Sequence, residues 1–296
     1  MSPTVTAMLP TLRAGFDRPV RRALLGVQCR DVADGRVVSD GLQLVLYDLW
    51  QPRPTRQARV LNTNRSGVFA LHDVPGIRSF LTPSEADSDA ALALDDLGSP
   101  ASPDLPRFRL TVHDTLNRYV DMALTPTLGQ GLWGPLGDGL PHVPLYSAAT
   151  RTPPIGMASL RTELRSATHP EQAIAWAHLR LMLNGVALAE GLSDAAGRVL
   201  MVFPLPRPRE GLPQGSPATA AALLDWPVTL QAFWSPERRA DLAQGHVPDL
   251  DGLLAQAPVP LLQHAAPPTP LGTLTLRAGQ TLLVASPPSS FLFVAD

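Results

Sequence analysis

The stretch VLNTNRSGVFALHDVPG, residues 60–76, decides the fold that the sequence predicts. It contains two apolar runs joined by a polar corner, Asn64-Arg65-Ser66-Gly67. Asparagine tolerates left-handed backbone angles and glycine adopts them freely, so Asn-x-x-Gly between two apolar runs is typical of a turn between β-strands. Residues 192–204 repeat this pattern, with Asp194 and Gly197 in the same places and a second apolar run ending at a proline. We therefore predict two copies of one β unit.

Composition bounds the class of protein. The 296 residues suffice for two domains with proper cores, or for one large domain. With 24 Lys and Arg against 26 Asp and Glu, the formal net charge is -2 and no basic block stands out, which argues against a nucleic-acid partner. Charged residues make up only 17%, so we expect other protein subunits to cover much of the surface. The 32 prolines favour short strands joined by rigid loops.

The first residues and the single cysteine indicate the compartment. Prolines and arginines interrupt residues 1–27 where a signal peptide needs an unbroken apolar segment. No run approaches the ~18 apolar residues of a membrane span. Cys29 is the only cysteine, which excludes an internal disulfide, and its place in an apolar strand pattern predicts a buried structural thiol. We expect a cytoplasmic protein without a signal peptide, assembled into a particle.

The predicted fold is all-β, with two immunoglobulin-like or transthyretin-like β-sandwich domains joined by a Pro/Gly-rich linker. Residues 1–22 lack a clear period and are assigned to an N-terminal arm. The first domain, residues 23–125, has strands at 24–30 and 42–48, the corner described above, and a hairpin at 108–124. The second domain, residues 156–296, carries loop insertions.

Residues 126–155 form the predicted linker, which glycines and prolines interrupt throughout. Its apolar side chains predict that it lies in a groove of its own protein or of a partner. The candidate partner-binding residues are Leu132, Trp133, Leu136, Leu140, Leu145 and Tyr146.

In the second domain, Asn184-Gly185 is a strong hairpin signal between strands at 175–183 and 186–192. A further strand is predicted at 226–234, and short helices at 236–244 and 250–257. Residues 271–277 and 281–285 are predicted to pair as a hairpin, followed by a last strand at 291–294.

No pattern for catalysis emerges. The seven histidines are scattered, with none at the spacing of a metal site, and the acids of 81–106 fit a solvated loop better than a calcium loop. There is no G-x-S-x-G elbow and no glycine-rich phosphate loop in a strand-to-helix context. Trp133, Trp176, Trp226 and Trp234 suit a core or an interface better than a sugar-binding face. We predict no enzyme, no catalytic residue, no cofactor, no metal and no small-molecule substrate.

The two units resemble the carboxypeptidase regulatory-like (transthyretin-like) β-sandwich. The resemblance rests on residues 26–34, 42–47, the run TNRSGVF at 63–69 and Val74-Pro75-Gly76. The second copy, SDAAGRV at 193–199, lacks the aromatic residue of that motif. The resemblance implies an accessory, interaction or stabilising module without catalytic residues.

A looser resemblance is to proteins encoded beside contractile, phage-tail-like injection systems. It rests on FRLTV at 108–112 with Asp114 and Arg118-Tyr119, on VPLYSA at 143–148 and on PPIGMA at 153–158. It implies a structural subunit at the baseplate or another end of the particle. Two alternatives remain: a carbohydrate- or peptide-binding module, which needs an exposed tryptophan, and a hydrolase with a fold-assembled site, which needs a histidine near a carboxylate.

Overall fold

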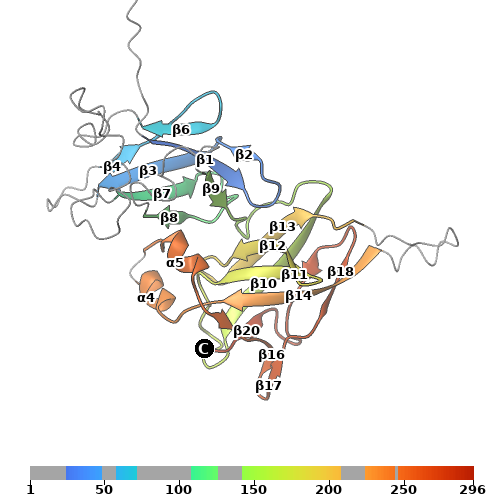
Figure 1. Cartoon of the computed structure of the whole chain (residues 1–296). Coiled ribbons are helices and arrows are strands. Elements are labelled where there is room, and N and C mark those ends of the chain that lie inside the picture. Colours follow the sequence, from blue (N-terminus) through green and yellow to red (C-terminus); the bar gives the residue numbers. More distant parts are fainter. Residues whose placement is uncertain (1–24, 49–57, 72–107, 126–141, 208–223, 244–245) are drawn as a thin grey trace, which may run out of the picture.

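The computed structural model describes residues 25–48, 58–71, 108–125, 142–207, 224–243 and 246–296 (Figure 1). Strands make up nearly all of the regular structure of these residues, and the two helices among them, α4 (Arg238–Ala243) and α5 (Leu250–Leu254), are short. The prediction of an all-β fold built from sandwich-like domains is confirmed. Within the described residues, no helix has the length and hydropathy needed to cross a bilayer.

The N-terminal sandwich consists of two sheets. One has the order β2-β1-β6-β5, with β9 also paired to β1, and the other has the order β4-β3-β7-β8. The strands are β1 (Leu25–Asp31), β2 (Val37–Val38), β3 (Leu42–Asp48), β4 (Ala58–Val60), β5 (Asn62–Thr63), β6 (Val68–Leu71), β7 (Phe108–Asp114), β8 (Met122–Leu124) and β9 (His142–Leu145).

Alternating side chains explain how this sandwich closes. On β7, Phe108, Leu110 and Val112 point inward and are buried, while the residues between them are partly or fully exposed. Val112 stands opposite Leu44 of β3, and Val27 of β1 belongs to the same buried cluster. The two inner faces therefore enclose one core, as expected for sheets packed face to face.

The C-terminal sandwich has the sheets β13-β10-β20-β16-β17, with β19 also on β10, and β12-β11-β14-β15, with β18 also on β14. The strands are β10 (Met157–Ser166), β11 (His178–Leu183), β12 (Val186–Leu192), β13 (Arg198–Pro204), β14 (Asp225–Phe233), β15 (Pro258–Val259), β16 (Leu261–Ala265), β17 (Pro268–Pro270), β18 (Leu274–Arg277), β19 (Leu282–Leu283) and β20 (Leu292–Val294).

The strand pairing confirms the predicted repeat. In the first sandwich β1 pairs antiparallel with β6, and in the second β10 pairs antiparallel with β13. Strand β3 lies between β4 and β7, as β11 lies between β12 and β14. The repeat extends to a feature that the sequence did not indicate: β1 has a parallel neighbour, β9, and β10 has parallel neighbours, β19 and β20.

The two Gly corners are built alike. Oδ1 of Asn64 accepts hydrogen bonds from the backbone N–H of Ser66 (2.9 Å) and Val68 (3.0 Å), and Gly67 has φ +71°. Glycine adopts this left-handed angle without strain because it has no Cβ. In this corner the Asn of the Asn-x-x-Gly pattern accepts the backbone hydrogen bonds, and its Gly supplies the left-handed angle.

Two predictions about the elements were wrong, and two strands were missed. Residues 142–145, assigned to the linker, form strand β9 of the first sandwich. Residues 271–285 do not pair as a hairpin, because β18 joins β14 and β19 joins β10 in the other sheet. Strands β16 and β17 were not predicted at all. Residues 1–22 and 126–141 lie outside the described residues.

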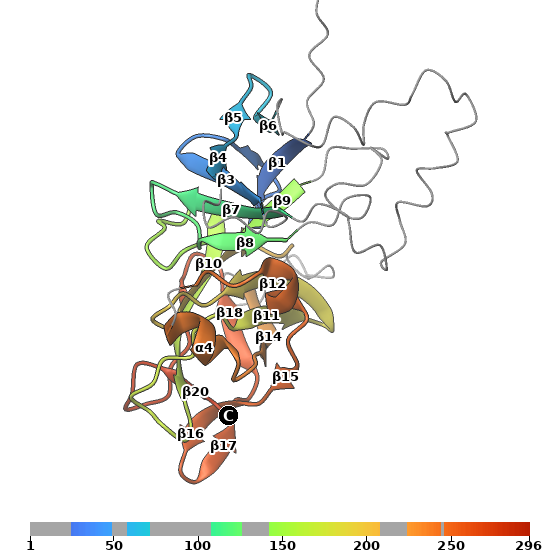
Figure 2. The ribbon, with the colours of Figure 1, turned by 90° about the vertical axis from the view of Figure 1, so that its left-hand side faces the viewer.

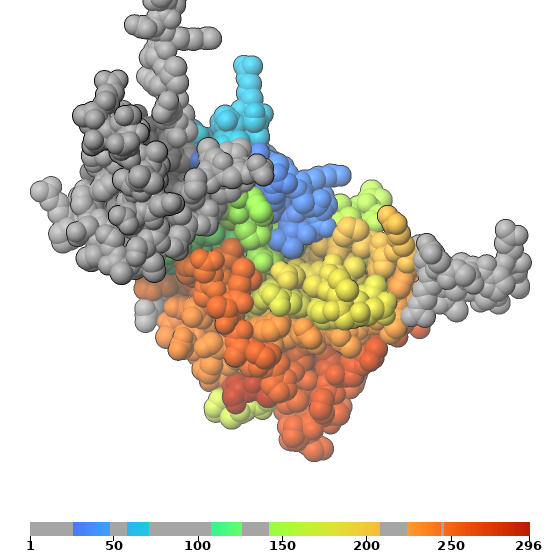
Figure 3. Space-filling model, in the orientation of Figure 1, coloured from blue at the N-terminus to red at the C-terminus, as the bar shows by residue number. Residues whose placement is uncertain are grey.

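The two sandwiches pack against each other (Figures 2 and 3). The core cluster of the first sandwich also contains Trp176, Leu192 and Leu250 from the second half of the chain. A smaller cluster joins Ala33 to Leu200 on β13. Each sandwich has a core cluster of its own, and the first cluster extends into side chains contributed by the second half of the chain.

Candidate functional site

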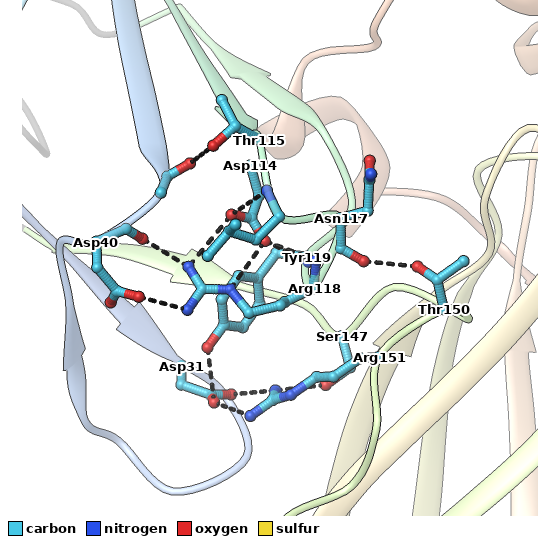
Figure 4. A network of polar contacts seen from close by, with 12 residues as sticks. Asp31, Asp40, Asp114, Thr115, Asn117, Arg118, Tyr119, Ser147, Thr150 and Arg151 are labelled. Atoms are coloured by element: carbon cyan, nitrogen blue, oxygen red, sulfur yellow. Dashed lines mark hydrogen bonds and ion pairs between the residues drawn. The ribbon is translucent and has the colours of Figure 1, made fainter.

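A buried ionic junction lies where the chain passes from the first sandwich to the second, and we call it the junction network (Figure 4). Asp31, at the end of β1, accepts hydrogen bonds from both terminal nitrogens of the Arg151 guanidinium: Nη1 donates to Oδ1 at 3.1 Å, and Nη2 donates to Oδ2. Tyr119 donates its hydroxyl to Oδ2 of Asp31 at 3.0 Å. Arg151 also donates to Oγ of Ser147 at 2.8 Å. All four side chains belong to buried residues.

The second half of the junction network is built on Asp114, the last residue of β7. Its carboxylate accepts the backbone N–H of Arg118 (2.6 Å) and of Tyr119 (3.2 Å), which fixes the turn after β7. The side chain of Arg118 returns to Asp114 and continues to Oδ2 of Asp40 at 2.8 Å. One carboxylate therefore holds a turn, and one guanidinium ties that turn to the loop before β3.

Tyr119 joins the two halves. The guanidinium carbon of Arg118 lies 5.3 Å from the centre of its ring, and that of Arg151 lies 4.9 Å away. An aromatic face attracts a cation at these distances. Burial and the nearby carboxylate of Asp31 raise the pKa of the Tyr119 hydroxyl, so the hydroxyl stays protonated and keeps its hydrogen bond.

The charged groups of the junction network stabilise one another. Burial by itself raises the pKa of Asp114, but hydrogen bonds from Arg118 outweigh it and leave that pKa below its usual value. Burial also opposes the charge of Arg151, and the hydrogen bonds to Asp31 outweigh it and raise the arginine's pKa. Both groups are therefore held in their ionised forms.

Arg161 of β10 fixes the same segment to the second sandwich. Its guanidinium donates to the backbone carbonyls of Ala149 (2.7 Å) and Arg151 (3.0 Å). Arg151 is thus held by its side chain from the first sandwich and by its carbonyl from the second. The arrangement connects this segment to both sandwiches, since the donors described bind carboxylates and carbonyls of this chain.

The predicted partner-binding residues fall into two groups. Leu145 and Tyr146 are buried, with exposed fractions of 0% and 2%, inside the chain's own core. The prediction that these two contact a partner is corrected, because both side chains pack in the core cluster of the first sandwich. Four residues lie outside the described part of the chain: Leu132, Trp133, Leu136 and Leu140.

The tryptophans that the carbohydrate-binding alternative required are buried. Trp176, Trp226 and Trp234 have exposed fractions of 8%, 3% and 2%. The indole of Trp234 donates to the carbonyl of Ala175 at 3.0 Å, and that of Trp226 donates to the carbonyl of Arg207. These three side chains offer no face to a sugar ring.

Two of the described histidines lie within 3.5 Å of a carboxylate, which is the arrangement that the hydrolase alternative required. Nδ1 of His113 is 2.8 Å from Asp121 on the exposed side of the β7–β8 hairpin. Nε2 of His178 is 3.5 Å from Glu190, with the imidazole wholly buried. Within the described residues no three metal-binding side chains gather in one place. Neither pair has a described nucleophile hydrogen-bonded to its histidine.

The junction network was not predicted from the sequence. Asp31 and Arg151 are far apart in the chain, and the only local signal was an aspartate ending an apolar strand and a turn beginning at Asp114. By contrast, Cys29 is buried as predicted, and burial raises the pKa of its thiol to about 12.

Comparison with known proteins leaves the family open. No protein-family model matches this sequence, and no curated protein matches it. The TIE protein of Bacillus anthracis is similar over 89% of this chain, at 8% identity and a TM-score of 0.22, and this chain spans about a third (33%) of its length. A proposed adhesin from Bacteroides ovatus is similar over 79% of this chain and 84% of its own, at 11% identity and a TM-score of 0.16. Likenesses this distant carry no argument about function.

Proposed function

We propose that this chain is a non-enzymatic structural subunit held by other protein subunits of a contractile, phage-tail-like injection particle, at its baseplate or another end. The observation that carries the structural role is the junction network, which clamps two sandwiches into one unit. A subunit that transmits force between neighbours needs such a joint, because a flexible hinge would dissipate the movement. The choice of particle is supported only by the resemblance at residues 108–119, 143–148 and 153–158.

The buried groups favour this role over a binding or catalytic one. Arg151 and Asp31 sit in a two-point ion pair that burial makes costly to break. The three described tryptophans of the second half are buried in the protein core. The side chains that a carbohydrate-binding function would need are therefore not available to a sugar. A low share of charged residues, 17%, agrees with a surface that neighbours cover.

The test is recovery of the tagged chain from its native cells, followed by mass spectrometry and electron microscopy of the sedimenting fraction. We expect sheath, tube and baseplate proteins to co-purify in one particle. The matched control carries the same tag on an abundant cytosolic protein of the same cells. A monomer that brings down nothing beyond this control contradicts the proposal. Recovery in a different kind of assembly supports the structural role and rejects the contractile particle.

A further inference from the structure

Four consecutive residues, 174–177, divide between the two hydrophobic cores just before β11. Ile174 and Ala177 belong to the core cluster of the second sandwich. Ala175 and Trp176 belong to the core cluster of the first sandwich. All four residues are buried, and Trp176, the most exposed of them, has an exposed fraction of 8%. In this short turn the second sandwich therefore places a tryptophan side chain in the core of the first.

The backbone of Trp176 is strained. Its φ angle is +62°, and the other described non-glycine residues with a positive φ are Asn117 and Asn184. Asparagine tolerates the left-handed region, whereas a bulky side chain is rarely found there. A bulky residue keeps such an angle only where the surrounding structure over-determines it.

A buried serine of the second sandwich holds the two ends of this turn. The hydroxyl of Ser193, which follows β12, accepts the backbone N–H of Ala177 and donates to the carbonyl of Ile174, both at 2.8 Å. The backbone N–H of Ser193 also donates to the carbonyl of Ala177 at 2.9 Å. The residues before and after Ala175 and Trp176 are therefore bound to one and the same serine.

Two further side chains bind the carbonyl groups at the centre of the turn. The indole of Trp234, directly after β14, donates to the carbonyl of Ala175 at 3.0 Å. The side-chain amide of Gln256, after α5, donates to the carbonyl of Trp176 at 2.9 Å. All these hydrogen bonds come from the second half of the chain, so the second sandwich over-determines the left-handed angle without help from the first.

The first sandwich contributes packing to the Trp176 side chain and no hydrogen bond to its N–H. Nε1 of Trp176 is buried and has no hydrogen-bond partner within the described residues. A buried N–H in this state is rare, because it has given up its hydrogen bond to water. The indole is therefore held at the joint by its shape and by the backbone that carries it.

We propose that Trp176 is a preset docking peg: the second sandwich by itself fixes the left-handed backbone at residue 176, and the first sandwich packs around the indole that this backbone presents. A large, rigid side chain on a fixed backbone enters the neighbouring core in one direction, so the peg sets the orientation of one sandwich relative to the other. The proposal concerns contacts within one molecule, so it does not depend on the kind of assembly that contains the chain.

Thermal unfolding of the full chain tests whether the angle is preset, by comparing Trp176→Gly with Trp176→Ala. Both variants lack the indole, so a difference between them reports on the backbone. If the second sandwich alone sets the left-handed angle, glycine fits it and alanine is strained. We expect the Tm of Trp176→Gly to be roughly 2–4 °C higher than that of Trp176→Ala.

The control for this comparison is Ala187→Gly, at an exposed position of β12, where glycine is expected to lower Tm. A Tm of Trp176→Ala that equals or exceeds that of Trp176→Gly would show that the backbone relaxes once the indole is gone. That result overturns the preset peg.

A distance measurement tests whether the peg sets the orientation. Spin labels on Val60→Cys and Val186→Cys, at exposed positions of the two sandwiches, report the distance between them, and the buried Cys29 stays unlabelled in the folded protein. We expect a narrow distance distribution in the otherwise wild-type chain and a broad one with Trp176→Gly. The control Leu254→Ala, which trims a partly buried residue packed against the same cluster, keeps the narrow distribution. A narrow distribution with Trp176→Gly, or a broad one with Leu254→Ala, overturns the proposal.

The variant Ser193→Ala keeps the indole and serves where the Trp176 variants do not fold. It removes the hydroxyl that holds both ends of the turn, so the same pair of labels is expected to give a broader distribution than in the wild type. A distribution as narrow as that of the wild type would show that the hold of the second sandwich on this turn does not set the orientation, and it overturns the proposal.

Discussion

Asn64 and Asp194 perform the same task in two different corners. Each side-chain Oδ1 accepts the backbone N–H of the residues two and four positions later, at 2.9 to 3.0 Å. In each corner the backbone carbonyl of the same residue also accepts the N–H of the following glycine. An amide and a carboxylate serve equally in these backbone bonds because each needs only one acceptor oxygen. Oδ2 of Asp194 in addition pairs with the exposed side chain of Arg198.

The first prediction follows from that equivalence. Asp194→Asn is expected to leave the free energy of unfolding almost unchanged, whereas Asp194→Ala, which leaves two backbone N–H groups without an acceptor, costs about 1–2 kcal/mol. Urea unfolding of both variants measures the difference. Equal losses in the two variants would show that the charge of Asp194, through its pair with Arg198, matters more than the acceptor.

Gly197 is expected to resist substitution more than a glycine with a similar backbone angle. A Cβ at Gly197 (φ +77°) would stand 2.5 Å from the carbonyl oxygen of Leu164, whereas one at Gly156 (φ +84°) would meet nothing within 4 Å. Both alanine variants carry the strain of a positive φ, so the contrast isolates the crowding. We expect Gly197→Ala to lower Tm clearly more than Gly156→Ala. Similar Tm values in the two variants would contradict the crowding.

Breaking the junction network on one side is expected to destabilise the protein strongly. Asp31→Asn or Arg151→Met leaves the charge of the other residue buried without an opposite charge beside it, at a cost of about 3–5 kcal/mol. The double variant Asp31→Leu with Arg151→Met recovers part of this loss. The exposed pair Arg36–Asp34 is the control, and Arg36→Ala leaves Tm unchanged. Additive losses in the double variant would show that the two residues do not act as a pair.

Asp114 makes stability depend on acid. Its folded pKa lies below the ordinary value, so its contribution is fully present above that ordinary value of about 3.9 and is lost as the pH falls through the folded pKa. The difference in stability between wild type and Asp114→Asn is therefore expected to be largest near neutral pH and to shrink in strong acid. Denaturant unfolding from pH 7 to pH 2 measures it, and the exposed variant Glu171→Gln serves as control. A difference that grows in acid would reverse the sign of the argument.

Cys29 is expected to report unfolding. Burial raises the pKa of its thiol to about 12, so at pH 8 it is neither exposed nor ionised in the folded protein. A thiol reagent should label it only after urea unfolds the chain. A Val60→Cys variant, at a position that is 54% exposed, is labelled at once at its new thiol and calibrates the assay. Fast labelling of Cys29 in native buffer would contradict its burial.

The sequence predicted what depends on neighbours in the chain. The Gly corners and the Asn184-Gly185 turn carry their geometry in a few residues, and both residues of that turn adopt positive φ angles in the structure. The alternation of apolar and polar side chains along β7 likewise indicated which face of the strand is buried. These signals are local, and they give strands and turns without saying which strands meet.

The errors all concern contacts between distant segments. The sequence assigns β9 to the linker because it contains Pro144. Among the described residues β9 pairs only with β1, and an edge strand tolerates a residue without an N–H. The hairpin predicted at residues 271–285 has its turn, but the two strands separate into different sheets. The pair Asp31–Arg151 likewise depends on the packing of the two sandwiches, which no short motif encodes.

The closing strands have a consequence for synthesis. Each sandwich ends with a strand laid parallel beside the strand that began it, β9 on β1 and β20 on β10. On the ribosome, the first strand of each unit waits with an open side until its last strand has emerged. Unpaired strand edges pair with other chains. A nascent or proteolysed molecule that lacks β9 or β20 is therefore the form most prone to aggregate.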